Sequence, residues 1–150
     1  MPTITPFLWL DVRVGEAVDF YTSLFDDSAV IDSSPGPDGD VFLATFTLGG
    51  QEFMILNGGP HYSLTPAFSM FLSLESQEEV DRYWDALGEG GEPGPCGWLV
   101  DRFGVSWQVI PSVLGRLMGD PDPVRAGRVR DAMLAMSKID VAGLQAAYDA

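Results

Sequence analysis

The sequence contains one cysteine, one histidine and only 8 lysine and arginine residues, and each scarcity excludes something. Cys96 has no second cysteine to pair with, so an intrachain disulfide is excluded and a reducing, cytoplasmic setting is favoured. The 22 aspartates and glutamates leave a formal net charge of −14. Binding to nucleic acid requires clustered basic residues, so we expect no nucleic-acid partner.

Charged residues are also missing from a long segment, residues 53–74, which raises the question of a membrane span. Asn57–His61 and Pro66 interrupt it, and lipid would leave their backbone groups without hydrogen-bond partners. Residues 1–6 have neither the basic nor the apolar region of a signal peptide. We therefore expect no membrane contact, and two buried strands joined by a loop within residues 53–74.

The remaining composition is that of a globular chain, with 46% hydrophobic and 11% aromatic residues. A chain of 150 residues buries enough surface to fold without a metal ion or a disulfide. We predict one domain, residues 1–150.

An internal repeat organises the chain. Residues 16–24 align with residues 78–86 at an offset of 62, with Glu, Val, Asp and Tyr in register. Apolar residues recur at helical spacing in both copies, so both are predicted to be amphipathic helices. Ser76 and Glu79 form a capping-box pattern at the start of the second helix.

Strands surround each predicted helix. Residues 7–10 and 68–74 precede the two helices, and residues 50–56 and 104–110 follow as matching glycine-led strands. Residues 41–48 form a further strand that Gly49 and Gly50 turn into the next. The predicted fold is α+β, with two βαβββ-type repeats at about 1–62 and 63–112.

The segment 113–150 continues beyond the repeats. Helices are expected at about 124–136 and from Asp140 to Tyr148, with apolar residues at helical spacing. They are interpreted as covering one end of the sheet or a partner subunit.

Several motifs carry a family resemblance. They are residues 5–9, 16–21, 57–61, 96–111, 120–123 and 138–140. Together they resemble the PhnB-like branch of the vicinal oxygen chelate superfamily, the group of glyoxalases, bleomycin-resistance proteins and extradiol dioxygenases. The resemblance implies a cupped mixed sheet and a homodimer.

Members of this branch often bear the label 3-demethylubiquinone-9 3-methyltransferase, which can be compared with the motifs here. A Rossmann-type methyltransferase needs a glycine-rich turn that runs from a strand into a helix. Gly88–Gly91 instead follows a predicted helix, and Asn57–Pro60 leads to a strand. The motifs therefore favour no S-adenosylmethionine site.

The resemblance also implies where a metal ion would bind in the metal-dependent members. Their His or Glu ligands would fall near residues 4–7 and 67–70 on the first strands, and at Met54 and Gln108 on the late strands. None of these positions holds a good ligand for a divalent cation. We expect no metal ion and no other cofactor.

A cavity in the cup would instead bind an organic ligand. Strand alternation and the family motifs together give these ligand-binding candidates, for each of which an ordinary core position is the alternative: Trp9, Phe46, Met54, Asn57, His61, Trp98, Trp107 and Gln108. Met54 and Gln108 occupy equivalent positions in the two repeats.

His61 and Cys96 are the candidate catalytic residues, because an imidazole could activate a thiol that lies within reach. A small buried cysteine and a hydrogen-bonding loop histidine are the alternative interpretation. The leading hypothesis is a cytoplasmic, metal-free homodimer that binds a neutral or cationic organic molecule, since a negative protein repels anions. An enzyme, either metal-dependent or the labelled methyltransferase, and a dimer that only binds protein partners are the alternatives.

Overall fold

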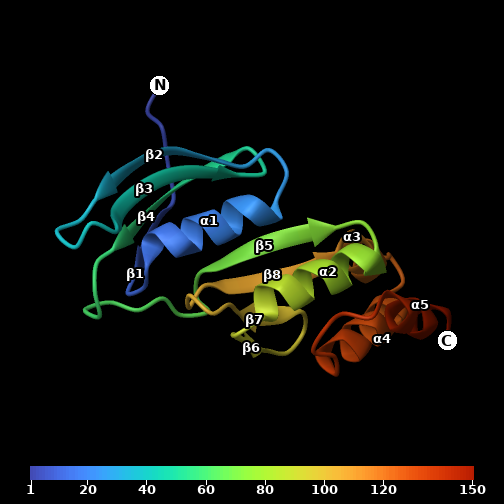
Figure 1. Cartoon of the computed structure of the whole chain (residues 1–150). Coiled ribbons are helices and arrows are strands. Elements are labelled where there is room, and N and C mark those ends of the chain that lie inside the picture. The colour runs from blue at the N-terminus through green and yellow to red at the C-terminus, as the bar shows by residue number, and fades with distance from the viewer. The chain divides into compact units, whose positions relative to one another are not determined.

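The computed structural model describes residues 1–150 and divides them into two compact units, residues 1–64 and 65–150. The division lies two residues after the predicted end of the first repeat. Figure 1 colours unit 1 from blue to green and unit 2 from green to red.

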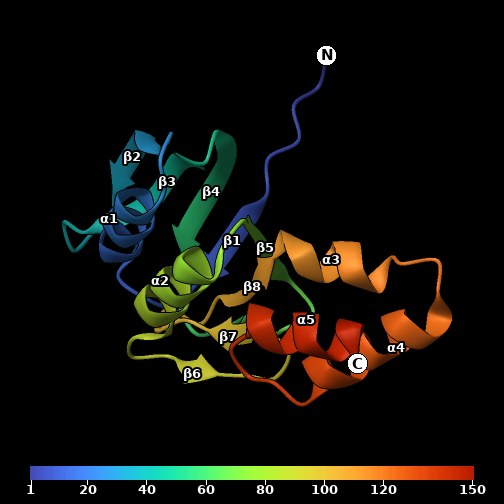
Figure 2. The ribbon, with the colours of Figure 1, turned by 90° about the vertical axis from the view of Figure 1, so that its right-hand side faces the viewer.

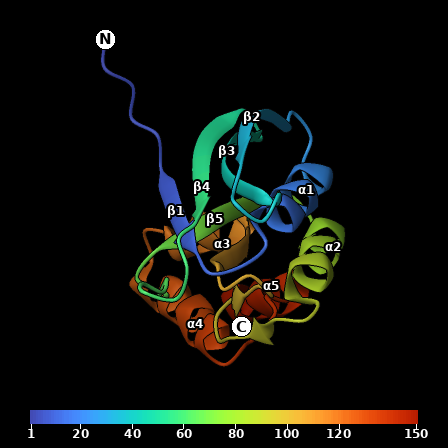
Figure 3. The same ribbon diagram turned by 60° about the vertical axis from the view of Figure 1, so that its left-hand side comes forward.

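Unit 1 is a four-stranded sheet with one helix. Its elements are β1 (Phe7–Leu10), α1 (Val14–Leu24), β2 (Ala29–Pro35), β3 (Val41–Leu48) and β4 (Gln51–Asn57). The strand order is β1-β4-β3-β2, visible in Figure 3, with β1 parallel to β4 and the other pairs antiparallel. Gly49 and Gly50 close the β3–β4 hairpin at φ of 56° and 82°, as the double-glycine turn predicted.

The two faces of this sheet differ in burial. Alternate residues of three strands, including Leu8, Phe46 and Ile55, are at most 1% exposed and lie on the face that α1 covers. The opposite face carries Trp9 and Met54, which are only half-buried. We call the face without a helix the free face of unit 1.

Unit 2 repeats this topology. Its first part contains β5 (Ser69–Leu74), α2 (Gln77–Gly88), β6 (Glu92–Pro93), β7 (Trp98–Val100) and β8 (Ser106–Pro111). The strand order is β5-β8-β7-β6, and β5 is parallel to β8 as β1 is to β4. The duplicated α+β arrangement predicted from the sequence is thereby confirmed.

Helix α2 begins where the capping box predicted. The Ser76 side-chain oxygen accepts a hydrogen bond from the Glu79 backbone N–H at 3.2 Å. The helix buries Val80 and Leu87 against the sheet side that holds Leu99, Trp107 and Val109. The opposite side of this sheet is the free face of unit 2.

A buried carboxylate organises the β7–β8 connection. Asp101 is 3% exposed, and its Oδ1 accepts hydrogen bonds from the backbone N–H groups of Phe103 and Val105 at 2.9 and 3.0 Å. Its Oδ2 accepts the indole N–H of Trp107 at 2.8 Å. Charge-assisted bonds of this kind offset the desolvation of a buried carboxylate.

Three helices follow the second repeat: α3 (Ser112–Met118), α4 (Pro123–Leu134) and α5 (Val141–Asp149). Residues 112–150 are called the extension, and Figure 2 shows its helices grouped beside β8. Helices at α4 and α5 were expected, whereas α3 was not. The extension has its own hydrophobic cluster, which consists of Ile110, Leu114, Leu117, Val129, Ile139 and Leu144.

Two sets of hydrogen bonds attach the extension to the second repeat. The Gln77 side-chain amide donates to the Ile139 carbonyl at 3.0 Å, and its oxygen accepts from the Val141 N–H at 2.7 Å. The backbone N–H groups of Cys96 and Gly97 donate to the carbonyls of residues 136 and 137 at 2.8 and 2.7 Å. The extension is therefore joined both to the start of α2 and to the β6–β7 turn.

Charge divides unevenly along the chain. The extension holds five of the 8 basic residues and five of the 22 acidic ones, so its formal charge is zero. The full net charge of −14 therefore lies in residues 1–111. No helix is long and apolar enough to cross a bilayer.

Candidate functional site

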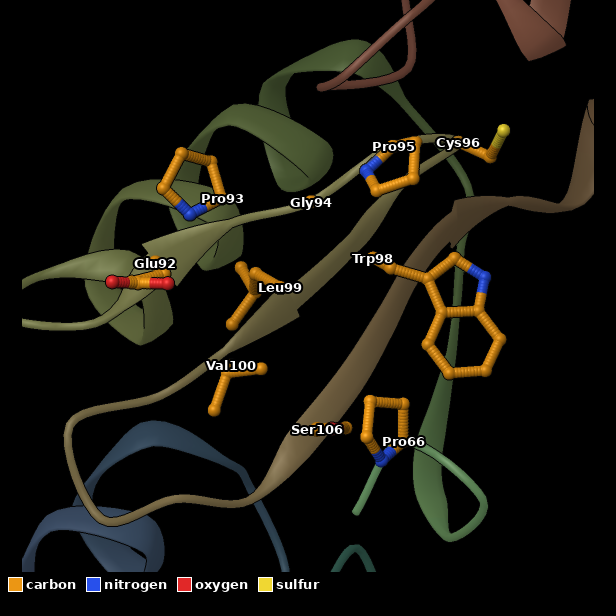
Figure 4. A pocket seen from close by; sticks show the side chains of 10 residues that line it. All are labelled: Pro66, Glu92, Pro93, Gly94, Pro95, Cys96, Trp98, Leu99, Val100 and Ser106. Carbon is orange, nitrogen blue, oxygen red and sulfur yellow. The ribbon is translucent and has the colours of Figure 1, made fainter.

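Two hollows flank the side chain of Trp98 in unit 2. The first, which we call the turn hollow, has a volume of about 520 Å³ and is shown in Figure 4; it is lined by Pro66, Glu92, Pro93, Gly94, Pro95, Cys96, Trp98, Leu99, Val100 and Ser106. The second, the extension hollow, also measures about 520 Å³; it is lined by Phe71, Ser73, Cys96, Trp98, Gln108, Ile110, Pro111, Ser112, Leu114, Gly115, Met118 and Met133. Trp98 and Cys96 are common to both.

Strand register builds the sheet wall of the extension hollow. Trp98 on β7 lies opposite Gln108 on β8, and Gln108 lies beside Phe71 on β5. These three side chains therefore form one row across the free face of unit 2. Phe71 is 62% exposed, so this apolar row is open to a ligand.

Gln108 supplies the polar group of the row. Its side-chain N–H donates to the Ser69 hydroxyl at 3.0 Å, which fixes the orientation of the amide. The amide oxygen accepts no hydrogen bond within unit 2 and remains available to an external donor. An apolar surface with one oriented acceptor is typical of sites for small organic molecules.

Cys96 lies in the tight turn between β6 and β7. Cys96 and Gly97 have φ of 58° and 82°, and the Trp98 N–H closes the turn onto the Pro95 carbonyl at 3.0 Å. A cysteine in the left-handed region is uncommon and strained. The turn places Cys96 where the two hollows meet. The backbone of this turn is held by the hydrogen bonds from Cys96 and Gly97 to the extension.

The electrostatics of the two hollows differ. Glu92 is the only charged residue of the turn hollow, and the extension hollow contains no charged residue. A carboxylate and an indole in the same hollow both favour a cation, since the face of an aromatic ring is itself electronegative. Neither hollow supplies a lysine or arginine to an anion.

Trp9 and Met54, two of the predicted ligand-binding residues, lie on the free face of unit 1. Met54 pairs with Phe7 on one side and Thr45 on the other. The indole N–H of Trp9 donates to the Gly59 carbonyl at 3.0 Å. Gly58 packs directly on the Trp9 ring, where a Cβ atom would lie 2.2 Å from a ring carbon. Trp9 therefore anchors the loop that follows β4.

Asn57 and His61 take less central positions in unit 1. Asn57 is paired with Leu10 at the end of β4, in the alternation of Ile55 rather than that of Met54. His61 is exposed, and its ring centroid lies 4.4 Å from that of Tyr62. His61 belongs to unit 1 and Cys96 to unit 2, so neither unit by itself assembles the hypothetical thiol–imidazole pair.

Phe46 and Trp107 need correction, because the structure places both on the helix-covered sides of their sheets. Phe46 is 0% exposed and stacks on Phe53 with a centroid distance of 5.8 Å. Trp107 is 3% exposed and donates to Asp101. Their side chains point away from the free faces because they alternate with Thr45 and Gln108.

The residues in register around Met54 and Gln108 do not fit a divalent metal ion. Met54 and Gln108 are flanked in register by Phe7 and Thr45 in unit 1 and by Phe71 and Trp98 in unit 2. These offer one amide, one hydroxyl and one thioether, whereas divalent cations favour carboxylates and imidazoles. No group of three His, Cys, Asp or Glu residues comes together.

The glycine-rich segments do not fit S-adenosylmethionine either. Gly88 ends α2, and the chain then enters β6, so this turn runs from a helix into a strand. The segment after β4 reaches β5 without an intervening helix. Neither segment has the strand-to-helix geometry that binds such a cofactor in a Rossmann fold.

Sequence reasoning missed the residues that the extension contributes to the site. Gly115, Met118 and Met133 line the extension hollow, although they lie far from the repeat motifs. One signal was present in the sequence, since three of the 6 methionines follow residue 111. Methionine-rich segments often form adaptable apolar surfaces.

Comparisons with known proteins agree with this architecture. The family model described as 3-demethylubiquinone-9 3-methyltransferase matches residues 2–110. A PhnB protein from Bacillus cereus is 36% identical, with a TM-score of 0.67, over 74% of this chain and 100% of its own. No curated protein matches the chain significantly.

More distant solved structures share the fold alone. A Pseudomonas aeruginosa protein is 24% identical with a TM-score of 0.57, over 71% of this chain and 95% of its own. The fosfomycin resistance protein FosX from Listeria monocytogenes, solved with Mn(II) and sulfate, is 16% identical with a TM-score of 0.51, over 71% and 89%. With most of its length matched by the family model, the chain belongs to the PhnB-like family described as 3-demethylubiquinone-9 3-methyltransferase.

Proposed function

We propose that this protein binds a small neutral or cationic organic molecule on the free face of unit 2, without a metal ion, as a homodimer in the cytoplasm. The observation that carries the proposal is the pair of apolar hollows around Trp98, with the Gln108 amide in the wall of the extension hollow. Each volume lies within the roughly 300–1,000 Å³ of ligand sites.

The lining chemistry supports a flat, apolar ligand. The indole of Trp98 offers an aromatic surface, and stacking on such a surface contributes about 0.5–1.5 kcal/mol beyond area burial. The free Gln108 oxygen would accept a hydrogen bond from a ligand hydroxyl or ammonium group. Together these groups would orient one polar end of an otherwise apolar molecule.

The charge distribution supports a neutral or cationic ligand over an anion. Residues 1–111 carry the whole net charge of −14, and the hollows contain no basic residue. A field of this sign repels anions and concentrates cations. Glu92 in the turn hollow would add a direct partner for a cation.

Binding is favoured over catalysis by the residues within reach. Unit 2 contains no histidine, so Cys96 has no imidazole within its own unit to activate it. Met54, Gln108 and their neighbours in register are unsuited to a divalent cation, which would supply Lewis acidity in a metal-dependent enzyme. The residues present can hold and orient a molecule.

The single cysteine provides a direct readout of occupancy. Cys96 lines both hollows, so a bound molecule should slow its alkylation by N-ethylmaleimide, followed by intact mass. Three probes share one ring system and differ in charge: anthracenemethanol, anthracenemethylammonium and anthracenecarboxylate. We expect the neutral and cationic probes to protect Cys96 at concentrations at least tenfold below those required of the anion.

A matched pair of variants tests where the probe binds. Trp98→Ala should abolish protection, whereas Trp84→Ala, which changes a tryptophan outside both hollows, should leave it intact. Both proteins are first compared by circular dichroism. Equal protection in the two variants, or none by any probe in the parent protein, would refute the proposed site.

Native mass spectrometry of the purified protein tests the assembly and the metal together. The proposal expects two chains per particle and no bound metal. One divalent ion per subunit that a chelator removes would overturn the metal-free assignment. A monomer at micromolar concentration would overturn the homodimer.

A further inference from the structure

The extension hollow has two walls of different origin. One wall consists of Phe71, Trp98 and Gln108, which belong to the duplicated sheet. The facing wall comes from the extension and includes Met118 and Met133. A ligand on the free face of unit 2 would therefore touch both the repeat and the extension.

The extension wall lies outside the part of the chain that the family model matches. The family model matches residues 2–110 and stops before α3 begins at Ser112. The Bacillus cereus PhnB protein is covered over its whole length by 74% of this chain. The sheet side of the hollow therefore lies in the matched segment, and the facing wall follows it in the chain.

The added wall is firmly mounted yet locally adaptable. Leu114 and Leu117 anchor α3 in the hydrophobic cluster of the extension, and Met118 and Met133 pack against the same cluster while half-buried. Methionine is unbranched and polarisable, and it makes favourable contacts with aromatic rings. Such a wall suits a bulky aromatic group.

Gly115 leaves an open gap at the exposed edge of that wall. It lies on α3 and lines the hollow, and a Cβ atom added there would meet no atom within 4 Å. A glycine in a helix interior is less favourable than alanine. The backbone at Gly115 does not require glycine, since its φ is not positive. The space beside it is therefore the feature that distinguishes this position.

We propose that the extension is the specificity element of the binding site: the gap at Gly115 accepts the bulky apolar end of the ligand, and Met118 and Met133 pack against it. This inference rests on the proposed function, because it assigns a selective role to one wall of the same site. Ligand size, rather than ligand charge, is the property that the extension selects.

The test fills the gap without disturbing the sheet. Gly115→Leu adds a branched side chain to the hollow, and Gly127→Leu makes the same change in α4, where a Cβ atom would meet only the end of the Arg130 side chain at 3.9 Å. Both substitutions replace a helical glycine by a better helix former, so both proteins should fold. Gly127 does not line either hollow.

Affinities are measured by calorimetry for benzyl alcohol, naphthalenemethanol and anthracenemethanol, a series that grows in ring size with one hydroxyl throughout. We expect Gly115→Leu to lower the affinity for anthracenemethanol at least tenfold and the affinity for benzyl alcohol less than twofold. Gly127→Leu should change neither affinity by more than twofold.

The outcomes separate this inference from the proposed function. If Trp98→Ala removes binding but Gly115→Leu leaves the size preference unchanged, the specificity role is refuted and the binding function remains. An equal loss of affinity for all three probes in Gly115→Leu would also refute size selection. Binding of none of the probes to the parent protein would overturn both.

Discussion

The two units of this protein have the same sheet order and helix placement but close their hairpins and use their free faces differently. Both bury one sheet face beneath a helix, with Phe53 in unit 1 and Trp107 in unit 2 at equivalent positions. The covered face is constrained by packing, so the repeats resemble each other there. The free face carries no such constraint and is where unit 2 has acquired its hollows.

The connections show the same divergence. Two glycines turn β3 into β4, whereas the buried carboxylate of Asp101 organises the corresponding connection between β7 and β8. Gly15 in α1 occupies the repeat position of Gln77, which joins α2 to the extension. At these two positions unit 2 uses a polar side chain where unit 1 has glycine.

Removing the buried carboxylate should produce the largest loss of stability. Asp101→Ala would leave two backbone N–H groups and the Trp107 indole N–H without their acceptor. Each orphaned buried donor costs about 1–3 kcal/mol, so the three together predict a loss of at least about 3 kcal/mol in the free energy of unfolding. Urea unfolding measures it. Asp131→Ala, at a side chain 71% exposed, is the control and should change stability by less than about 0.5 kcal/mol. Equal midpoints for the two variants would show that Asp101 is not structurally required.

Two glycines with nearly the same φ, one in each unit, allow side-chain crowding in the two units to be compared. Gly39 in unit 1 has φ of 83° and open space around a Cβ atom, whereas at Gly97, with φ of 82°, a Cβ atom would lie 2.8 Å from Ile110 Cδ1. Gly39→Ala should cost about 1–2 kcal/mol for the left-handed backbone. Gly97→Ala should cost a further 1–3 kcal/mol or so from overpacking. Thermal unfolding of both variants checks the difference, and equal costs would contradict the packing of the turn.

Loss of the Gln77 side chain should loosen the extension. Gln77→Ala removes the hydrogen bonds to Ile139 and Val141, which at about 1 kcal/mol each amounts to about 1–2 kcal/mol. Hydrogen exchange at the Val141 amide should accelerate roughly tenfold, while exchange in β3 stays unchanged. Gln145→Ala, which alters an exposed glutamine of α5, is the matched control. Unchanged exchange at Val141 would argue against this attachment.

The smallest expected effect is an acid response confined to the extension. The Tyr148 hydroxyl donates to Asp120 at 2.6 Å and, with the Asp122 N–H, lowers the pKa of that carboxyl below its usual value. The lowered pKa means that the stabilisation is present above about pH 4 and is lost as pH falls through the folded pKa. Tyr148→Phe should raise the pKa of Asp120 in a carbon-detected NMR titration. Tyr62→Phe, in unit 1, should not, and an identical titration in both variants would contradict the contact.

Much of the fold could be predicted from the sequence because local chemistry determined it. The strand at residues 7–10, the Ser76 cap and the Gly49–Gly50 hairpin all agree with the structure. The repeat alignment also placed Met54 and Gln108 correctly on equivalent strands, and both lie on free faces. These features depend on residues close in sequence or on the duplication itself.

The remainder depended on long-range packing. Alternation shows that neighbours on a strand face opposite sides, but only the position of the helix shows which side is covered, so Phe46 and Trp107 were assigned to the wrong face. Asp101 lies between an apolar strand and a charged arginine and gives no sign of burial in the sequence. The short α3 contains Gly115, which weakens a helical pattern.

The attachment of the extension also determines when the site can be completed. Gln77 bonds to residues 62 and 64 positions further along the chain, and the turn at Cys96 and Gly97 bonds to a segment 40 positions later. During synthesis the first unit and the second sheet emerge before these partners exist. The extension wall of the hollow is thus translated after both sheets, and a chain truncated after β8 would lack that wall.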